Sequence, residues 1–253
     1  MKNTSPEHWF LGTGETLQSP AFTSGNAVTA FVDGKDYLAD LKTTLEACSG
    51  TILIAGWRVS GEQLLSPRLE DGKLSGDRFV DTISAAAKRG CSVRALLFNV
   101  PGTQLPGPFR VWHARDNYEF AKAIIANGGE AQLDSRLPPV PASAHHQKFI
   151  VATSRDGDLH AAYVGGIDVC LDRWDHRLHD NPPLRQADHV SLGDFETHTA
   201  SQPGWHDVQV RVRGPAVAQL YRAFQARWND SRPPNHDPLL AAVGRHSPLE
   251  DAA

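Results

Sequence analysis

Apolar runs rich in branched residues alternate with helix-like segments along most of the chain, and this alternation strongly constrains the fold. Such an order is typical of an α/β layer structure and argues against a helical bundle or an all-strand sandwich. We therefore expect a mixed β-sheet flanked by helices on both faces. The expected strands are residues 27–32, 51–57, 92–100, 148–153, 161–167 and 208–212, and the expected helices are residues 35–48, 78–89, 117–127 and 215–228.

The length and composition favour one domain with a flanking segment at each end. A chain of 253 residues with 40% hydrophobic content can bury one sizeable core, which we assign to residues 25–230. Residues 1–24 are expected to be an N-terminal extension. Residues 231–253 have the composition of a linker and are expected to add nothing to the core.

Clusters of Gly, Pro and polar residues predict the irregular parts of the chain. The stretches 100–109 and 137–143 are expected to be surface loops, and the second leads directly into His145. Residues 171–204 are polar, rich in histidine and interrupted by prolines. They are expected to form a long irregular loop above the sheet, in a position suited to substrate selection.

Charge and cysteine content exclude several classes of protein. A net charge of −4 and a pI near 6.3 give no overall positive field, so no nucleic-acid partner is expected. Cys48, Cys91 and Cys170 lack C-x-x-C spacing, which argues against a disulfide scaffold and a thiolate zinc site and favours buried thiols. The sequence shows neither a secretory signal nor an apolar run of roughly 20 residues, so we expect a soluble, cytoplasmic protein unless export uses another route.

The segment from His145 to Lys148 carries the strongest chemical signal. Residues two apart on a strand share a face, so His146 and Lys148 are expected to point to the same side while Gln147 points away. A neutral imidazole can attack phosphorus, and an ammonium group can hold the phosphate oxygens. The pair therefore predicts phosphodiester chemistry. His145 is expected to lie beside the site, as a packing neighbour or a contact for the substrate.

The triplet His146-Gln147-Lys148, followed by Gly165-Gly166-Ile167-Asp168, resembles the signature of the phospholipase D superfamily. An H-x-K triplet alone is a weak signal, but the flanking segments are also similar to the eukaryotic-type branch of that family. The likeness covers roughly residues 25 to 230 and implies the N-terminal half of a phospholipase D fold. The similar flanks are residues 25–26, 32–34, 54–57, 172–175 with His179, 205–208 and 213–229.

The sequence departs from the family pattern at two places. Thr153 stands where the family has an acidic residue, and Asp156 and Asp158 come only later; because that acid is mostly structural in the family, local packing is affected more than chemistry. The family also builds one active site from two H-x-K motifs, whereas this chain has one. The resemblance therefore implies a partner, preferably a separate chain or fragment with the second motif, and otherwise a second copy of this chain.

The resemblance also implies a reaction and a set of roles. The chain would hydrolyse the distal phosphodiester of a phospholipid to phosphatidic acid and an alcohol, through a phosphohistidine on His146 with Lys148 holding the phosphate. Asp175 would hold the far nitrogen of His146, with Asp168, otherwise a substrate-side residue, as the alternative. Gly165 and Gly166 would form a plain turn or bring backbone amides to the phosphate.

No metal or cofactor is expected, because the phosphohistidine route needs no ion. The acidic and histidine residues between positions 175 and 189 are accordingly not interpreted as a metal site. Two other functions stay open: a single-motif homodimeric nuclease, which the acidic balance disfavours, and a non-catalytic half that binds a phosphorylated ligand or supports a partner. Relatives without signal peptides include lipases delivered into rival cells by the type VI secretion apparatus, so an antibacterial toxin is a further hypothesis.

Overall fold

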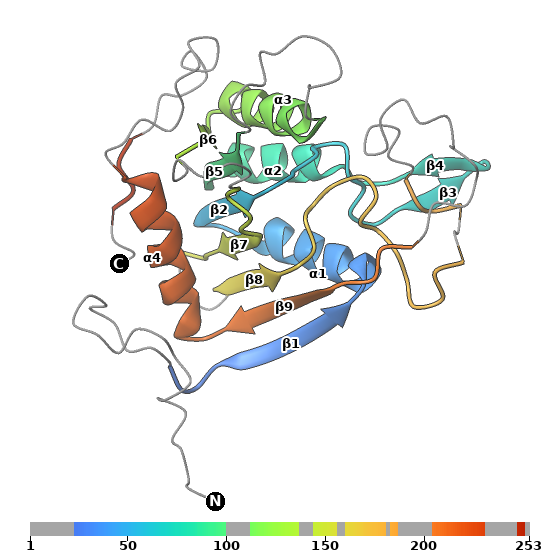
Figure 1. Ribbon diagram of the computed structural model, residues 1–253, viewed down its shortest axis with the longest axis horizontal. Coiled ribbons are helices and arrows are strands. Elements are labelled where there is room, and N and C mark those ends of the chain that lie inside the picture. Colours follow the sequence, from blue (N-terminus) through green and yellow to red (C-terminus); the bar gives the residue numbers. More distant parts are fainter. Residues whose placement is uncertain are drawn as a thin grey trace, which may run out of the picture.

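A mixed sheet forms the centre of the protein. The computed structural model describes residues 23–99, 112–136, 144–155, 160–180, 183–186, 204–230 and 247–250. Within these ranges a 7-stranded sheet has the order β1-β9-β8-β7-β2-β5-β6, which Figure 1 shows from β6 at the top to β1 at the bottom. Its strands are β1 (Ala27–Val32), β2 (Thr51–Gly56), β5 (Ser92–Phe98), β6 (Glu130–Asp134), β7 (Phe149–Ala152), β8 (Ala161–Gly165) and β9 (Val208–Arg213).

The strand directions bring several chain segments to one edge of the sheet. β2, β5 and β6 are parallel, whereas β7 and β9 run antiparallel to their neighbours. The carboxyl ends of β1, β2, β5, β6 and β8 therefore lie at the same edge as the amino ends of β7 and β9. We call this edge the motif edge, because His146 and Lys148 immediately precede β7 there.

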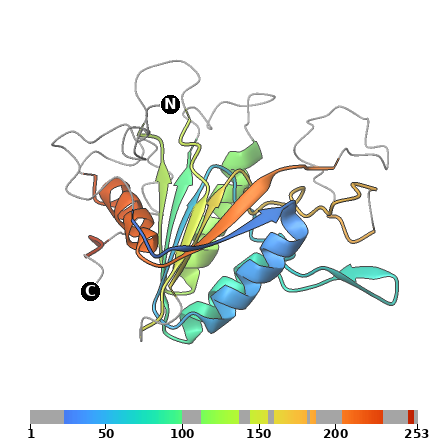
Figure 2. The same cartoon turned by 90° about the horizontal axis from the view of Figure 1, so that it is seen from below.

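Four helices cover the sheet unequally. α1 (Gly34–Ala47), α2 (Phe79–Lys88) and α3 (Trp112–Ala126) lie on one face, and α4 (Ala216–Trp228) lies on the other, as Figure 2 shows. Alternation along β2 supplies both cores: Ile52 and Ile54 pack on the side of the three helices, and Leu53 and Ala55 pack on the side of α4. A strand buried on both faces needs the continuous apolar run that the sequence has here.

The sequence-based assignment of elements is confirmed apart from three strands. All six expected strands and all four expected helices are present, with small differences at their ends. The prediction missed β6, because Gln132 and Asp134 interrupt its apolar pattern. Both are buried and hydrogen-bonded: Gln132 donates to the Trp228 carbonyl of α4 at 3.1 Å, and Asp134 accepts from Arg227 of α4 at 2.6 Å and from Arg136 at 2.9 Å.

A projecting hairpin was also missed. β3 (Arg68–Glu70) and β4 (Lys73–Ser75) pair antiparallel around the dipeptide Asp71-Gly72. Both turn residues have positive φ, 50° and 73°, which is the conformation that an Asp-Gly hairpin turn favours. An Asp-Gly dipeptide in a sequence predicts a hairpin turn of this kind.

The chain after α4 contradicts one expectation. Leu249 is only 5% exposed and packs in the core beneath α4, and its backbone carbonyl accepts a hydrogen bond from Asn229 at 2.9 Å. The expectation that residues 231–253 add nothing to the core is therefore wrong for the described residues 247–250. A short apolar side chain in a linker-like composition can still fill a gap that only the folded sheet and helix create.

Other expectations are confirmed within the described ranges or lie outside them. The three cysteines are free and buried, and residues 171–180 and 183–186 form no regular element. The expected loops at 100–109 and 137–143, and residues 1–22 of the expected extension, lie outside the described residues. None of the described helices combines the length and apolar character that crossing a bilayer requires.

Candidate active site

The structure brings His146 and Lys148 together as expected, although both residues lie just before β7 and not on the strand itself. The Nζ atom of Lys148 lies 3.0 Å from Nε2 of His146. An ammonium group only donates hydrogen bonds, so in this contact Nε2 is the acceptor. His146 is exposed, whereas the Lys148 side chain is 8% exposed. The site therefore combines an exposed imidazole with a largely buried cation directly beside it.

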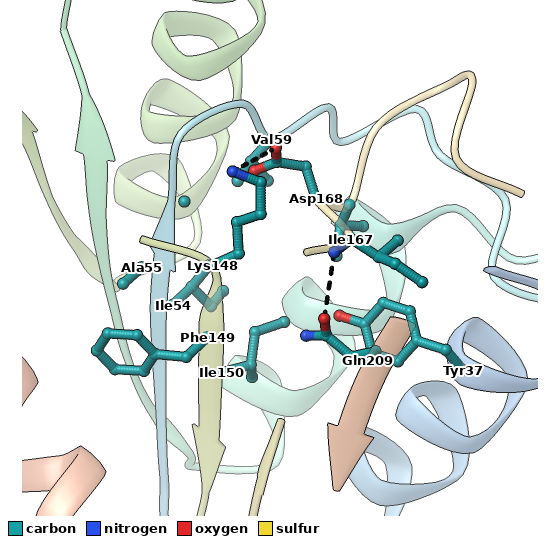
Figure 3. Close-up of a pocket in the computed structure, with 12 residues that line it drawn as sticks. Tyr37, Ile54, Ala55, Val59, Lys148, Phe149, Ile150, Ile167, Asp168 and Gln209 are labelled. Carbon is teal, nitrogen blue, oxygen red and sulfur yellow. Dashed lines mark hydrogen bonds and ion pairs between the residues drawn. The ribbon is translucent and has the colours of Figure 1, made fainter. Parts of the chain in front are cut away.

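The Asp168 carboxylate forms an ion pair with the Lys148 ammonium group. Its Oδ2 lies 3.1 Å from Lys148 Nζ, and its Oδ1 accepts a hydrogen bond from the Arg58 backbone amide at 3.1 Å. Figure 3 shows the Lys148 and Asp168 side chains pointing toward each other across a small pocket. Burial raises the pKa of the Asp168 carboxyl, and Lys148 offsets part of that rise.

The position of Asp168 corrects its expected roles. Its side chain is 1% exposed and its oxygens contact Lys148 and the Arg58 amide, so it neither faces a substrate nor supports the ring of His146. A carboxylate this close to a phosphate would also repel it. Asp168 instead holds the Lys148 ammonium group in place.

Trp57 contacts both His146 and Lys148, and the sequence did not predict these contacts. Its ring meets the His146 ring edge-on, with centroids 5.2 Å apart and an interplanar angle of 75°. The same ring lies 5.4 Å from Lys148 Nζ, within the range of a cation–π contact. Trp57 directly follows β2, so its position at the motif edge depends on the pairing of β2 with β7.

The two glycines of the Gly165-Gly166 turn do not offer their amides to a ligand. The Gly165 amide donates to the Lys148 carbonyl at 3.3 Å, and the Gly166 amide donates to the Val208 carbonyl at 3.0 Å. The interpretation that these amides approach a phosphate is therefore wrong. A Cβ atom at Gly165 would lie 2.5 Å from the Val208 carbonyl, and one at Gly166 would collide with the Asp207 carboxylate. The glycines permit close packing of β8 against the start of β9.

His145 turns away from the exposed side of the site. It is 7% exposed, and its Nε2 lies 2.7 Å from Oε1 of Gln147. Burial lowers the pKa of the His145 imidazole, which favours the neutral ring, so Nε2 donates to the amide oxygen of Gln147. The structure therefore supports the packing role of His145 and not a contact with the substrate.

Asp175 belongs to a second polar cluster. Its Oδ2 accepts hydrogen bonds from Nδ1 of His179 at 2.7 Å and from Arg185 at 3.1 Å, and its Oδ1 accepts from the His176 amide at 2.8 Å. Among the described residues it makes no contact with His146. The expectation that Asp175 supports the ring of His146 is therefore corrected: it supports His179, and its hydrogen bond raises the pKa of that imidazole.

The second cluster extends to two residues of the family-like flanks, Asp33 and His206, for which the sequence predicted no role. Asp33 is buried at the end of β1, and its Oδ1 lies 2.8 Å from Nδ1 of His206, just before β9. Its Oδ2 lies 3.7 Å from Nε2 of His179. Asp33 and His179 both have positive φ, 67° and 51°, an unfavourable conformation that the surrounding contacts maintain.

These three side chains are the described residues that could hold a metal ion. Asp33, His179 and His206 each offer one ligand atom, and these atoms lie within 4.8 Å of one another. One carboxylate and two imidazoles suit a divalent transition metal, and the hydrogen bond from His179 to Asp175 is of the kind that orients a ligating histidine. His179 lies in the histidine-rich segment 171–204. Asp33 and His206 are distant from it in the sequence, and the pairing of β1 with β9 brings them to it.

Thr153 fills the place of the missing acidic residue at the opposite end of β7. Its hydroxyl oxygen accepts a hydrogen bond from the Thr51 amide at 2.8 Å, and its carbonyl accepts from the Gly50 amide at 3.0 Å. The hydroxyl therefore satisfies a backbone group at the start of β2. Packing at this position is maintained without a carboxylate, and Asp156 and Asp158 lie outside the described residues.

Comparisons with known proteins identify the family of the chain. The family model for phospholipase D matches residues 44–247. The chain is 27% identical over 239 residues to phospholipase D1 of Saccharomyces cerevisiae, a match covering 83% of this chain and 13% of the yeast protein. It is 25% identical over 232 residues to phospholipase D alpha 1 of Vigna unguiculata, covering 77% of this chain and 28% of the plant protein.

The chain thus spans less than a third of the length of these two relatives. A solved structure of a phospholipase D family member, Nuc from Salmonella typhimurium, aligns with a TM-score of 0.49 and 13% identity, covering 82% of this chain and 97% of that one.

Proposed function

Because this chain belongs to the phospholipase D family, we propose that it is one half of an enzyme that hydrolyses the distal phosphodiester of a phospholipid. The products are phosphatidic acid and the head-group alcohol. The observation that carries the proposal is the 3.0 Å contact between Lys148 Nζ and Nε2 of an exposed His146. It supports an attack by the imidazole on a phosphate whose oxygens the ammonium group holds.

The reaction proceeds in two displacements. In the first, the Nε2 lone pair of His146 attacks phosphorus, an N–P bond forms, and the bond from phosphorus to the head-group oxygen breaks. The departing oxygen takes a proton from a general acid. In the second, water attacks phosphorus, the N–P bond breaks, and the electron pair returns to Nε2 while the water proton passes to the same acid–base group.

Lys148 can serve both steps without releasing Asp168. An ammonium group has three donors, so one can stay on Asp168 while the donor now directed at His146 turns to a phosphate oxygen. Two opposite unit charges about 4 Å apart gain about 4 kcal/mol in a partly screened site, before desolvation is subtracted. That interaction stabilises the charge on phosphorus where the nucleophile arrives.

The general acid must come from outside this chain's H-x-K motif. The sequence contains one such motif, and in the family arrangement the second motif supplies the acid. General acid catalysis typically contributes about 10²- to 10⁴-fold, so a lone half would be a poor catalyst. The proposal therefore includes a partner that carries a second H-x-K, preferably a separate chain or fragment and otherwise a second copy.

An exposed apolar face supports the existence of this partner. On the α4 side of the sheet, Val28 and Val32 of β1 lie in register with Val212 and Val208 of β9. Val28, Val32 and Val208 are 64%, 54% and 43% exposed. The face continues the core beneath α4, because Val164 of β8 belongs to the edge of that core and pairs with β9. Contiguous exposed apolar surface of this kind marks an interaction site.

The test measures head-group release and phosphatidic acid formation from phospholipid vesicles together with the mass of the active species. We expect activity to elute with an assembly and not with the monomer. Val32→Asp should dissociate the assembly and abolish activity, whereas Leu69→Asp, at a 45% exposed position on the β3–β4 hairpin, should change neither. Full activity from a strict monomer contradicts the partner, and cleavage of nucleic acid in place of lipid contradicts the substrate class.

A further inference from the structure

Trp57 contacts both members of the proposed nucleophile and cation pair. Its ring lies 5.2 Å from the His146 ring and 5.4 Å from Lys148 Nζ, while those two groups are 3.0 Å apart. We propose that Trp57 is a positioning residue that holds the His146 ring and the Lys148 ammonium group in their reactive arrangement. This inference rests on the proposed function and deepens it by assigning what organises the pair.

The backbone that carries Trp57 is fixed by a buried amide. Asn117 of α3 is 0% exposed, and its Nδ2 donates to the Trp57 carbonyl at 2.9 Å and to the Phe98 carbonyl at 2.7 Å. Its Oδ1 accepts a hydrogen bond from the Val59 amide at 2.7 Å. One side chain thus ties the exits of β2 and β5 together at the motif edge, so the indole is attached to a rigid support.

The turn after β2 also requires Gly56. A Cβ atom there would collide with a methyl group of Val59, so only glycine lets the chain fold back this tightly. The tight turn places Trp57 at the surface of the site, with its side chain partly exposed, while Val59 returns to the core. The position of the ring is therefore determined by backbone contacts on both sides of it.

An aromatic ring suits this position because it attracts the ammonium group without neutralising it. Asp168 already supplies one negative charge to Lys148 at 3.1 Å. A second carboxylate in place of Trp57 would cancel the positive charge that a phosphate needs, whereas the quadrupole of an indole face leaves the net charge unchanged. The edge contact with His146 also limits rotation of that ring, which keeps Nε2 directed at the ammonium group.

The first experiment needs no activity. Nitrogen-15 NMR of the His146 imidazole in the isolated chain reports which ring nitrogen carries the proton. In the wild type we expect the Nδ1-protonated tautomer, with Nε2 accepting from Lys148. Trp57→Leu should give a mixture of tautomers, and Trp57→Phe, which keeps an aromatic face, should retain most of the wild-type state. An unchanged tautomer in Trp57→Leu overturns the inference.

The second experiment follows single-turnover phosphorylation of His146 and steady-state kinetics in the assembled enzyme. Trp57→Leu should lower kcat by about 2- to 30-fold, the range expected for loss of a cation–π contact, with KM changed less than about twofold. Trp57→Phe should recover most of the loss. Trp205→Leu is the matched control, because Trp205 is 39% exposed and stacks on Arg173.

The outcomes separate this inference from the proposed function. A loss of kcat in Trp57→Leu with unchanged melting temperature and recovery by phenylalanine supports the positioning role. An equal loss in Trp57→Leu and Trp205→Leu, or a loss that follows reduced stability, overturns it. If the wild type itself has no lipid-hydrolysing activity, the proposed function fails, and the NMR result still decides whether Trp57 orders the pair.

Discussion

Two polar clusters lie at the motif edge, and each contains histidine and carboxylate groups in a different relation. In the first cluster, formed by Trp57, His146, Lys148 and Asp168, the carboxylate contacts the lysine and the lysine donates to the imidazole. In the second cluster, formed by Asp33, Asp175, His179 and His206, carboxylates contact the imidazoles directly. The difference decides what each histidine can do.

An imidazole that accepts from an ammonium group keeps its nitrogen lone pair beside a positive charge. That is a favourable arrangement for attack on an anionic phosphodiester, because the substrate is attracted to the nucleophile. An imidazole that donates to a buried carboxylate lies beside negative charge, which repels phosphate and attracts cations. Similar residue types at one edge of a sheet therefore suit the proposed nucleophile in one cluster and a candidate metal ligand set in the other.

The largest expected effect separates the two histidines. His146→Ala should lower turnover by roughly 10⁴- to 10⁶-fold, as removal of a nucleophile does, while the melting temperature stays close to that of the wild type because the side chain is exposed. His179→Ala should lower turnover far less. Trapping of phosphate on the protein, acid-labile and base-stable, should vanish only in His146→Ala. Equal losses of turnover in the two variants would break the comparison.

The next effect concerns the second cluster. Asp175→Asn removes the charge that Arg185 and His179 share, and breaking such a buried pair typically costs about 3–5 kcal/mol in the free energy of unfolding. Urea denaturation measures this cost. Asp180→Asn, in which the exposed partner of His176 is changed, is the matched control and should cost less than about 1 kcal/mol.

The same Asp175→Asn variant also tests the role first assigned to Asp175. Turnover per folded molecule should fall only modestly, because the described contacts of Asp175 go to the second cluster. A collapse of turnover with unchanged stability would instead mean that Asp175 acts on His146, and the comparison between the clusters would fail.

The smallest expected effect is a pH dependence of the free energy of unfolding, caused by Asp168 in the first cluster. Burial raises the pKa of the Asp168 carboxyl above its ordinary value of about 3.9. The protonated carboxyl therefore stabilises the folded state at pH values below about 3.9, and this contribution is lost as the pH rises through the raised pKa. Asp168→Asn stays neutral at every pH. The free energy of unfolding of the wild type should therefore decline relative to that of the variant as pH increases above about 4.

Denaturation curves over a pH series measure this slope. Asp71→Asn, an exposed change in the β3–β4 turn, serves as the control for losing one surface charge. Parallel curves for wild type and Asp168→Asn across this range would show that the Asp168 carboxyl titrates alike in the folded and unfolded chain.

The elements that sequence reasoning found are those with runs of apolar residues. β7 is buried throughout and β2 is buried from Ile52 to Gly56, whereas β1 has the same kind of apolar run and is largely exposed. The apolar pattern did not reveal β6, because the buried Gln132 and Asp134 have hydrogen-bond partners on α4, which is distant in the sequence, and on Arg136. A polar residue in a sequence is interpreted as exposed unless a buried hydrogen-bond partner is known. The period of apolar residues alone could therefore not reveal β6.

The sequence by itself determined the His146–Lys148 pair, because the two residues are only two positions apart and their contact depends on the local chain just before β7, whatever β7 packs against. Only the tertiary structure decided which carboxylate meets which histidine. Asp33 reaches His206 and His179 because β1 pairs with β9, and Asp168 reaches Lys148 because β8 pairs with β7. Hydrogen bonds and ion pairs act over a few ångströms, so they depend on strand order and register, which neighbouring residues in a sequence do not specify.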